Sequence, residues 1–188
     1  MIYFFTPYGF DGNLGRAYNE YCKLVPDDSW ICFLDGDIML LNKDWGHHLE
    51  EIVNKYPDTG LFTCVTNRVA CTDQCYGNVI SDNDSVISHR KIALELESKN
   101  RLDVEVIKYP ISGYLMMFRK DVWREVGGFC ESVNPVLTYK IKRNIAGVDN
   151  DFSERILNKG YKIRICKGFY VLHYYRMIEG IEFKEHIR

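Results

Sequence analysis

The run Trp30-Ile31-Cys32-Phe33-Leu34 leads directly into Asp35-Gly36-Asp37. An apolar run of this length is typical of a strand that is buried on both faces. Open α/β sheets bind their ligands beyond the carboxyl ends of such strands. The stretch therefore predicts an α/β sheet in which one buried strand carries two carboxylates to a site.

Strand and helix patterns alternate on both sides of this stretch. Short apolar runs predict further strands at residues 2–5, 61–65, 110–118, 161–166 and 169–174. Apolar residues at helical spacing predict helices at residues 14–25, 44–56, 86–99, 120–126 and 149–158. We expect a single α/β domain over residues 1–188, a Rossmann-like α/β/α sandwich with a mixed, mainly parallel sheet.

The composition is that of an ordinary globular protein, with 46% hydrophobic and 27% charged residues. A net charge of −2 offers no general attraction to nucleic acid or to anionic lipid. No apolar stretch approaches the ~18 residues of a membrane span, and Met1 leads into Ile2 without a basic signal-peptide start. We therefore expect a cytoplasmic protein without a nucleic-acid partner or a transmembrane segment, and peripheral membrane contact stays open.

The seven cysteines are an odd number and are scattered along the chain, which favours reduced thiols over a disulfide framework. Cys64, Cys71 and Cys75 lie close together in sequence, so they are candidate metal ligands. No Cys-x-x-Cys pair or adjacent histidine completes a zinc pattern around them. Their role stays open.

Asp35 and Asp37 suit a hard cation, because two carboxylates across a glycine can face one metal ion that also contacts diphosphate oxygens. We expect Gly36 to permit the tight turn between them. The alternative is a turn with two solvated acids, and the Asp-x-Asp spacing occurs three times in the chain. Helix capping accounts for the copy at residues 82–84. The copy at residues 149–151 begins a predicted helix, where Asp149 fits both a capping role and that of a general base.

Two further residues have a structural and a functional interpretation. Arg16, early in the first predicted helix, is either a surface residue or a partner for phosphate. His173, in the last apolar strand, is either a core histidine or a ligand of the same metal ion.

Five segments keep an order that resembles the family 2 glycosyltransferases of the GT-A fold. They are NLGRAYNE (13–20), WICFLDGDIML (30–40), ISGYLMMFRKDVWREVGGF (111–129), VDNDFSERILNKGYKI (148–163) and FYVLHYY (169–175). The resemblance implies that residues 35–37 are the metal-binding motif and that Arg16 and Asn19 occupy the positions of a basic helix. It also implies that Asp149 is the catalytic base, with Asp151 as a second acid, and that His173 joins the metal site.

The activity implied by this resemblance is an inverting transfer of a hexose from a nucleotide sugar, expected to be a UDP-sugar, to a saccharide or glycolipid acceptor. Mn or Mg would be the cofactor. The family has a helix and a strand that are missing here, since only residues 6–12 separate the first strand from the basic helix. We therefore expect the nucleotide to contact Thr6, Pro7, Tyr8, Asp11, Arg16, Asp35 and Gly36. Val148 stands where the family usually has glutamate.

Two other functions remain open. A sugar-phosphate nucleotidyltransferase would use a glycine-rich phosphate loop, for which Gly9, Gly12 and Gly15 are candidates. A non-catalytic sugar-nucleotide or carbohydrate binder would keep the fold without turnover. In the glycosyltransferase, the predicted loops at residues 66–85 and 131–147 are expected to contribute to the acceptor pocket.

Overall fold

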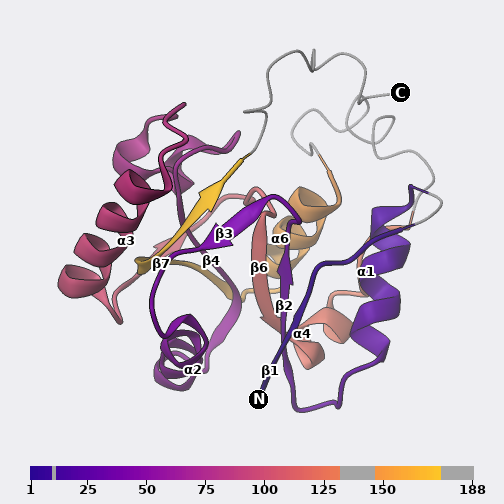
Figure 1. Cartoon of the computed structure of the whole chain (residues 1–188). Coiled ribbons are helices and arrows are strands. Elements are labelled where there is room, and N and C mark those ends of the chain that lie inside the picture. Colours follow the sequence, from indigo (N-terminus) through magenta and orange to yellow (C-terminus); the bar gives the residue numbers. More distant parts are fainter. Residues whose placement is uncertain (10–11, 132–146, 175–188) are drawn as a thin grey trace.

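The computed structural model describes residues 1–9, 12–131 and 147–174 (Figure 1). Within these ranges the chain forms one seven-stranded sheet with the order β1-β2-β6-β4-β7-β3, and β5 pairs with β7 beside this path. The strands are β1 (Ile2–Phe5), β2 (Trp30–Leu34), β3 (Ile38–Leu40), β4 (Thr59–Thr66), β5 (Val104–Ile107), β6 (Leu115–Arg119) and β7 (Lys162–His173).

The sheet is mixed, as the sequence predicts. β1 pairs with β2 and β4 with β7 in parallel, whereas the other four strand pairs are antiparallel. These pairings give β1, β2, β4 and β7 one common direction, and β3, β5 and β6 run the opposite way. Four of the seven strands are therefore parallel to one another, although most neighbouring pairs are antiparallel. The carboxyl ends of these four strands therefore meet at one edge of the sheet, at the top of Figure 1.

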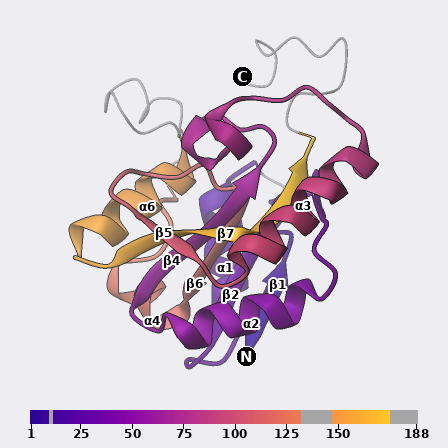
Figure 2. The same ribbon diagram turned by 90° about the vertical axis from the view of Figure 1, so that its left-hand side faces the viewer.

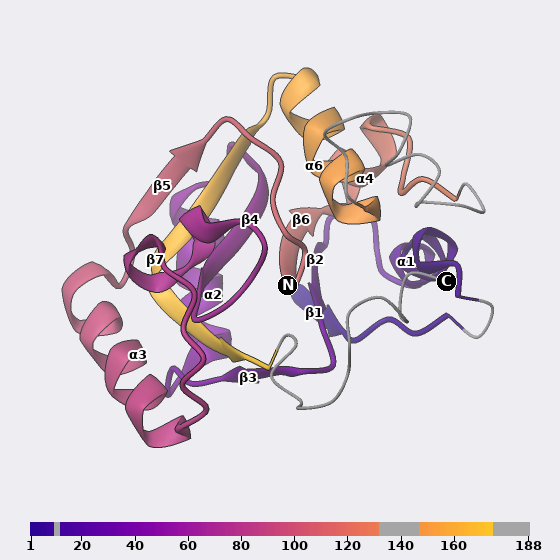
Figure 3. The same cartoon turned by 90° about the horizontal axis from the view of Figure 1, so that it is seen from above.

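Helices cover both faces of the sheet. α1 (Leu14–Lys23), α4 (Lys120–Glu125) and α6 (Val148–Asn158) lie together on one side (Figure 3), and α2 (Trp45–Lys55) packs on the other. α3 (Val86–Asn100) lies along β7 (Figure 2). Two short 3-10 turns, Thr72–Gln74 and Tyr76–Asn78, form part of the long segment before α3. The three-layer α/β/α arrangement is thus confirmed.

The core forms two clusters because side chains alternate between the faces of each strand. Phe33 and Phe118 belong to the cluster under α1 and α6, whereas Cys32 and Met117 belong to the cluster under α2. All four side chains are at most 1% exposed. Both faces of β2 are therefore buried, as its continuous apolar run predicts.

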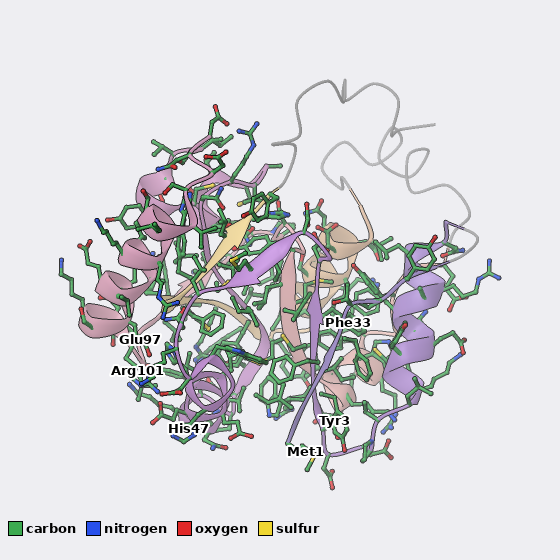
Figure 4. The ribbon with its side chains drawn as sticks, viewed as in Figure 1. Met1, Tyr3, Phe33, His47, Glu97 and Arg101 are labelled. Carbon is green, nitrogen blue, oxygen red and sulfur yellow. The ribbon has the colours of Figure 1, made fainter. Side chains whose placement is uncertain are left out.

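An ion-pair cluster joins the end of α3 to α2. Arg101 lies 2.7 Å from Glu51 of α2 and also pairs with Glu97 of α3. Figure 4 shows Glu97 and Arg101 beside His47, which lies on α2. The cluster ties α3 to α2 and contains none of the candidate site residues named above.

The structure differs from the prediction at several strands. Neither β3 nor β5 was predicted; β5 is an edge strand that is partly exposed and lacks an apolar run. The predicted strands at residues 161–166 and 169–174 are one strand, β7, whose register with β4 shifts after Cys166. The predicted strand at residues 110–118 begins only at Leu115, because the preceding backbone is bound by α6: Ile111 N donates to Ser153 Oγ.

None of the helices in the described part of the chain combines the length and the hydrophobicity that a bilayer crossing requires. The longest is α3, with 15 residues, and its sequence alternates apolar and charged side chains. The corresponding expectation from the sequence concerned the whole chain, and this finding covers only the described ranges.

Candidate active site

Asp35, Asp37 and His173 converge at the carboxyl edge of the sheet. They come from the end of β2, the start of β3 and the end of β7, and one ligand atom from each lies within 4.8 Å of the others. Nε2 of His173 is 3.3 Å from Oδ1 of Asp37 and 3.9 Å from Oδ2 of Asp35. Among the residues that the structure describes, this is the single group of His, Cys, Asp and Glu with such geometry. We call it the metal-binding group.

The backbone holds the Asp35–Asp37 turn from both sides. Asp35 N donates to the carbonyl of Tyr114 at 2.9 Å, and Tyr174 N donates to the carbonyl of Asp37 at 2.9 Å. Gly36 is not among the glycines with positive φ, and a Cβ built on it would lie 3.6 Å from Thr6 Cγ2, an ordinary contact. Gly36 fits the turn, as expected, but the backbone there does not require a glycine. The same contact places Thr6 beside the turn.

His173 is held in one orientation by a loop that follows β4. Its Nδ1 lies 3.0 Å from the carbonyl of Arg68 and donates to it, so Nε2 faces the two carboxylates. Asn67 accepts from His173 N at 2.7 Å and donates to the His173 carbonyl at 3.2 Å. The imidazole is 2% exposed and stacks on Tyr114 with ring centroids 5.2 Å apart. A second nitrogen bound to a carbonyl is how proteins orient a histidine that ligates a metal.

The charges in the metal-binding group are arranged for a cation. Burial raises the pKa of Asp35 to about 6; His173 opposes this rise, and the charges of Asp37 and Asp149 add to it. The neighbouring imidazole of His173 lowers the pKa of Asp37. A bound metal ion would relieve the repulsion that Asp37 exerts on the buried carboxylate of Asp35. The oxygen and imidazole donors suit Mn²⁺, and the two carboxylates also suit Mg²⁺.

Asp149 is connected to this group through two consecutive residues of the loop before β6. Gly113 N donates to Asp149 Oδ2 at 2.7 Å, and the carbonyl of the next residue, Tyr114, accepts from Asp35 N. Burial raises the pKa of Asp149, against the effect of the N–H groups of Asn150 and Gly113. A Cβ at position 113 would lie 2.5 Å from Asp149 Cβ. Glycine at this position therefore lets Asp149 approach the metal-binding group.

A buried glutamine fixes the loop that carries Gly113. Gln74 accepts from Ser112 N at 2.8 Å and donates to the Ser112 carbonyl at 3.1 Å. It also donates to Thr63 Oγ1 at 3.0 Å and is fully buried. The sequence analysis missed Gln74, Asn67 and Arg68. Their segment reads only as a polar loop, and no local pattern shows which distant backbone it contacts.

The remaining nucleotide-contact candidates belong to the segment after β1 and to α1. Pro7 is half-buried and Tyr8 is exposed, and both follow Thr6 along the chain. Arg16 is on the exposed side of α1, where its backbone N–H donates to the capping side chain of Asn13 at 2.9 Å. Asp11 lies outside the described residues. Their contacts with a nucleotide remain a prediction.

Two positions suggested by the resemblance have structural roles instead. Asn19 is buried and accepts from Phe129 N at 2.8 Å and from Trp123 Nε1 at 2.9 Å, which fixes the turn after α4 to α1. Asp151 forms a 2.7 Å ion pair with Arg155, one turn further along α6. Each side chain is satisfied by contacts within the protein, so we do not place Asn19 or Asp151 among the reacting groups.

The cysteine and capping interpretations are also resolved. The seven cysteines are free, and none of them belongs to a metal-binding group within the described ranges, so the interpretation of Cys64, Cys71 and Cys75 as ligands is wrong there. At residues 82–84 the capping interpretation needs a correction, because the N-cap of α3 is Ser85, which accepts from Ser88 N.

Comparisons with known proteins add no family assignment to this site. A scan against models of protein families and a search of curated proteins both find no match to the chain. The metal-binding group, Asp149 and the loop between them therefore carry the functional argument.

Proposed function

We propose that the chain is a metal-dependent, inverting glycosyltransferase of GT-A type, which moves a hexose from a nucleotide sugar to a saccharide or glycolipid acceptor. One observation carries the proposal: Asp35 of the metal-binding group and Asp149 are hydrogen-bonded to the consecutive residues Tyr114 and Gly113. A cation-binding cluster and a separate, half-buried carboxylate thus share one edge of the sheet. This pairing suits the transfer of a group from a diphosphate to a hydroxyl.

Asp35, Asp37 and His173 would hold the Mn or Mg ion. When bound, such an ion neutralises diphosphate oxygens and stabilises the departing nucleoside diphosphate. The chain has a net charge of −2, so it has no overall attraction for an anionic donor. The oriented imidazole and the two carboxylates provide the local site that the donor requires.

Asp149 would take the proton from the acceptor hydroxyl. Burial raises the pKa of its carboxyl, which makes the carboxylate a stronger base. The N–H of Gly113 fixes one carboxylate oxygen and thus the direction of the group. Because Asp35 and Asp37 serve the metal ion, Asp149 remains to activate the acceptor for a single displacement, which inverts the anomeric carbon.

The donor is expected to be a UDP-sugar. Thr6 lies beside the Asp35–Asp37 turn, so the segment after β1 reaches the position where a nucleoside attached to the metal-bound diphosphate would lie. Pro7, Tyr8 and Asp11 continue this segment, and Arg16 follows on α1. We propose these residues as the nucleoside and phosphate contacts.

Gly15 argues against the nucleotidyltransferase alternative. A Cβ at this position would lie 1.9 Å from the carbonyl of Cys130, so the glycine permits close packing of α1. The position is inside α1 and buried, not in a phosphate loop. The proposed function therefore fits the role of this glycine better.

The proposal is tested by incubating the protein with Mn²⁺ and nucleotide hexoses and by measuring the nucleoside diphosphate released. We expect release of UDP from a UDP-hexose, and a loss of at least about a hundredfold in Asp149→Asn. The variant should still bind Mn²⁺ and UDP. Pyrophosphate release from a nucleoside triphosphate would instead identify a nucleotidyltransferase, and binding without turnover in the wild type would identify a binding protein.

A further inference from the structure

Tyr18 lies on α1, between the strand that ends at the metal-binding group and the helix that begins with the candidate base. Its ring stacks on Phe33 of β2 with centroids 4.7 Å apart and meets Phe129 edge-on at 4.8 Å. Phe129 in turn stacks on Phe152 of α6 at 3.9 Å. Figure 4 shows Phe33 on the side of β2 that faces α1. These contacts fix the Tyr18 ring between β2, which leads to Asp35, and α6, which carries Asp149.

The hydroxyl of Tyr18 differs from those of the other two buried tyrosines in the described ranges. Tyr114 donates to the carbonyl of Cys64, and Tyr170 forms a 2.7 Å hydrogen bond with His89 Nδ1. Tyr18 is only 5% exposed, yet no described residue hydrogen-bonds to its hydroxyl. The hydroxyl oxygen is not among the fully buried polar atoms without a partner in the described part of the chain, so solvent, and therefore a ligand, can reach it. A bound ligand would supply the missing partner.

Both functional carboxylates act on this hydroxyl through their charges. Burial raises the pKa of Tyr18 most, and the negative charges of Asp35 and Asp149 raise it further. The phenol therefore stays protonated and acts as a hydrogen-bond donor. Its hydroxyl lies within the influence of the metal-binding group on one side and of the candidate base on the other.

We infer that Tyr18 is a substrate-contacting residue whose hydroxyl donates a hydrogen bond to the transferred sugar, between the metal-binding group and Asp149. This inference rests on the proposed function. A hexose that leaves a metal-bound diphosphate for an acceptor activated by Asp149 has to lie between these groups. Sugar hydroxyl and ring oxygens accept hydrogen bonds, so Tyr18 contributes to the recognition of the sugar and not of the nucleoside.

The test compares Tyr18→Phe with the matched control Tyr21→Phe. Tyr18→Phe removes the hydroxyl and keeps the ring contacts; Tyr21 is on the same helix and packs on Phe5, with ring centroids 5.1 Å apart. Calorimetry measures how the wild type and both variants bind UDP-, GDP- and dTDP-hexoses and the parent diphosphates in the presence of Mn²⁺. We expect Tyr18→Phe to lose about tenfold in affinity for the hexose donor and nothing for its diphosphate. Tyr21→Phe should match the wild type with both.

The possible outcomes separate this inference from the proposed function. If Tyr18→Phe binds the hexose donor as tightly as the wild type, or loses affinity for donor and diphosphate equally, the sugar contact is refuted while the function stands. If the wild type binds none of these ligands, both fail. Deoxy analogues of the bound hexose test the contact from the ligand side. One deoxy analogue should bind the wild type more weakly than the parent hexose donor does. Tyr18→Phe should bind this analogue and the parent donor with equal affinity.

Discussion

Nε2 of His173 lies 3.3 Å from Oδ1 of Asp37, although 135 positions separate the two residues along the chain (173 − 37 − 1). The contact depends on the pairing of β3 with β7, in which Ile38 is opposite His173. The turn at residues 35–37 thus gains its third ligand only when the last strand docks. A metal ion held by these residues, as proposed, would link its binding to the completion of the sheet and is expected to stabilise the fold.

Asp37→Asn is predicted to weaken Mn²⁺ binding by at least about tenfold, because it removes the carboxylate that lies beside His173 and carries one of the two charges. Isothermal titration with Mn²⁺ measures the effect. Asp84→Asn is the matched control, since Asp84 has the same Asp-x-Asp spacing, is exposed and lies in the loop before α3. Equal Mn²⁺ affinity in the two variants would refute the assignment of the metal-binding group.

Asn67→Ala is predicted to affect both metal binding and stability. The change removes both hydrogen bonds to the backbone of His173, so the imidazole loses its fixed position. We expect Mn²⁺ affinity to fall by about tenfold or more and the free energy of unfolding to fall by ~2 kcal/mol. Urea denaturation and Mn²⁺ titration measure the two effects. A loss of stability with unchanged Mn²⁺ affinity would show that Asn67 supports the fold alone.

Gly113→Ala is predicted to reduce turnover while Mn²⁺ binding is kept. The new Cβ would lie 2.5 Å from Asp149 Cβ, so the candidate base has to move. We expect turnover to fall by about a hundredfold, as for a misplaced catalytic group. Gly46→Ala in α2 is the control, because nothing lies within 4 Å of its added Cβ. That variant should keep its activity and gain about 0.5–1 kcal/mol in stability; an active Gly113→Ala protein would exclude Asp149 as the base.

The sequence predicts the parts of this site that local patterns encode. The apolar run before Asp35 indicates a buried strand, and the sheet then brings its carboxyl end to the site. The family resemblance suggested His173 as a metal ligand, and the structure places it beside the two carboxylates. The start of α1 is also locally encoded, since the side chain of Asn13 accepts from Arg16 N.

The missed residues act through contacts that no local pattern encodes. Gln74 belongs to a polar loop, and its role depends on the backbone of Ser112, which is 38 positions away. Tyr18 resembles any apolar helix position, because only the docking of α6 places Asp149 near its hydroxyl. Asn19 was interpreted through the resemblance, and its contacts to the turn at Phe129 exist only after α1 and α4 pack together.

The pairing of Asp58 with Lys162 and Arg164 is expected to make the stability of the fold depend on pH. These residues lie at the central parallel strands β4 and β7. Asp58 precedes β4, and its carboxylate lies 2.6 Å from Lys162 Nζ and 3.0 Å from Arg164 Nη2, both on β7. Hydrogen bonds from Lys162 and then from Arg164 lower the pKa of Asp58 from 3.8 to about 2. A carboxyl with a lower pKa in the folded state stabilises the fold above the unfolded pKa. This contribution is lost as the pH falls through the folded value.

We therefore predict that Asp58 contributes to stability fully above about pH 4, and that the contribution disappears between about pH 4 and pH 2. In Asp58→Asn the free energy of unfolding should be lower at neutral pH and should fall less steeply over this interval than in the wild type. Asp28→Asn is the control, since Asp28 is also exposed and forms no ion pair with another described residue. Urea denaturation at several pH values measures the slopes, and parallel curves for wild type and Asp58→Asn would show that the pair contributes nothing. Added salt should weaken the difference at neutral pH, because Asp58 is half exposed and its ion pairs are screened.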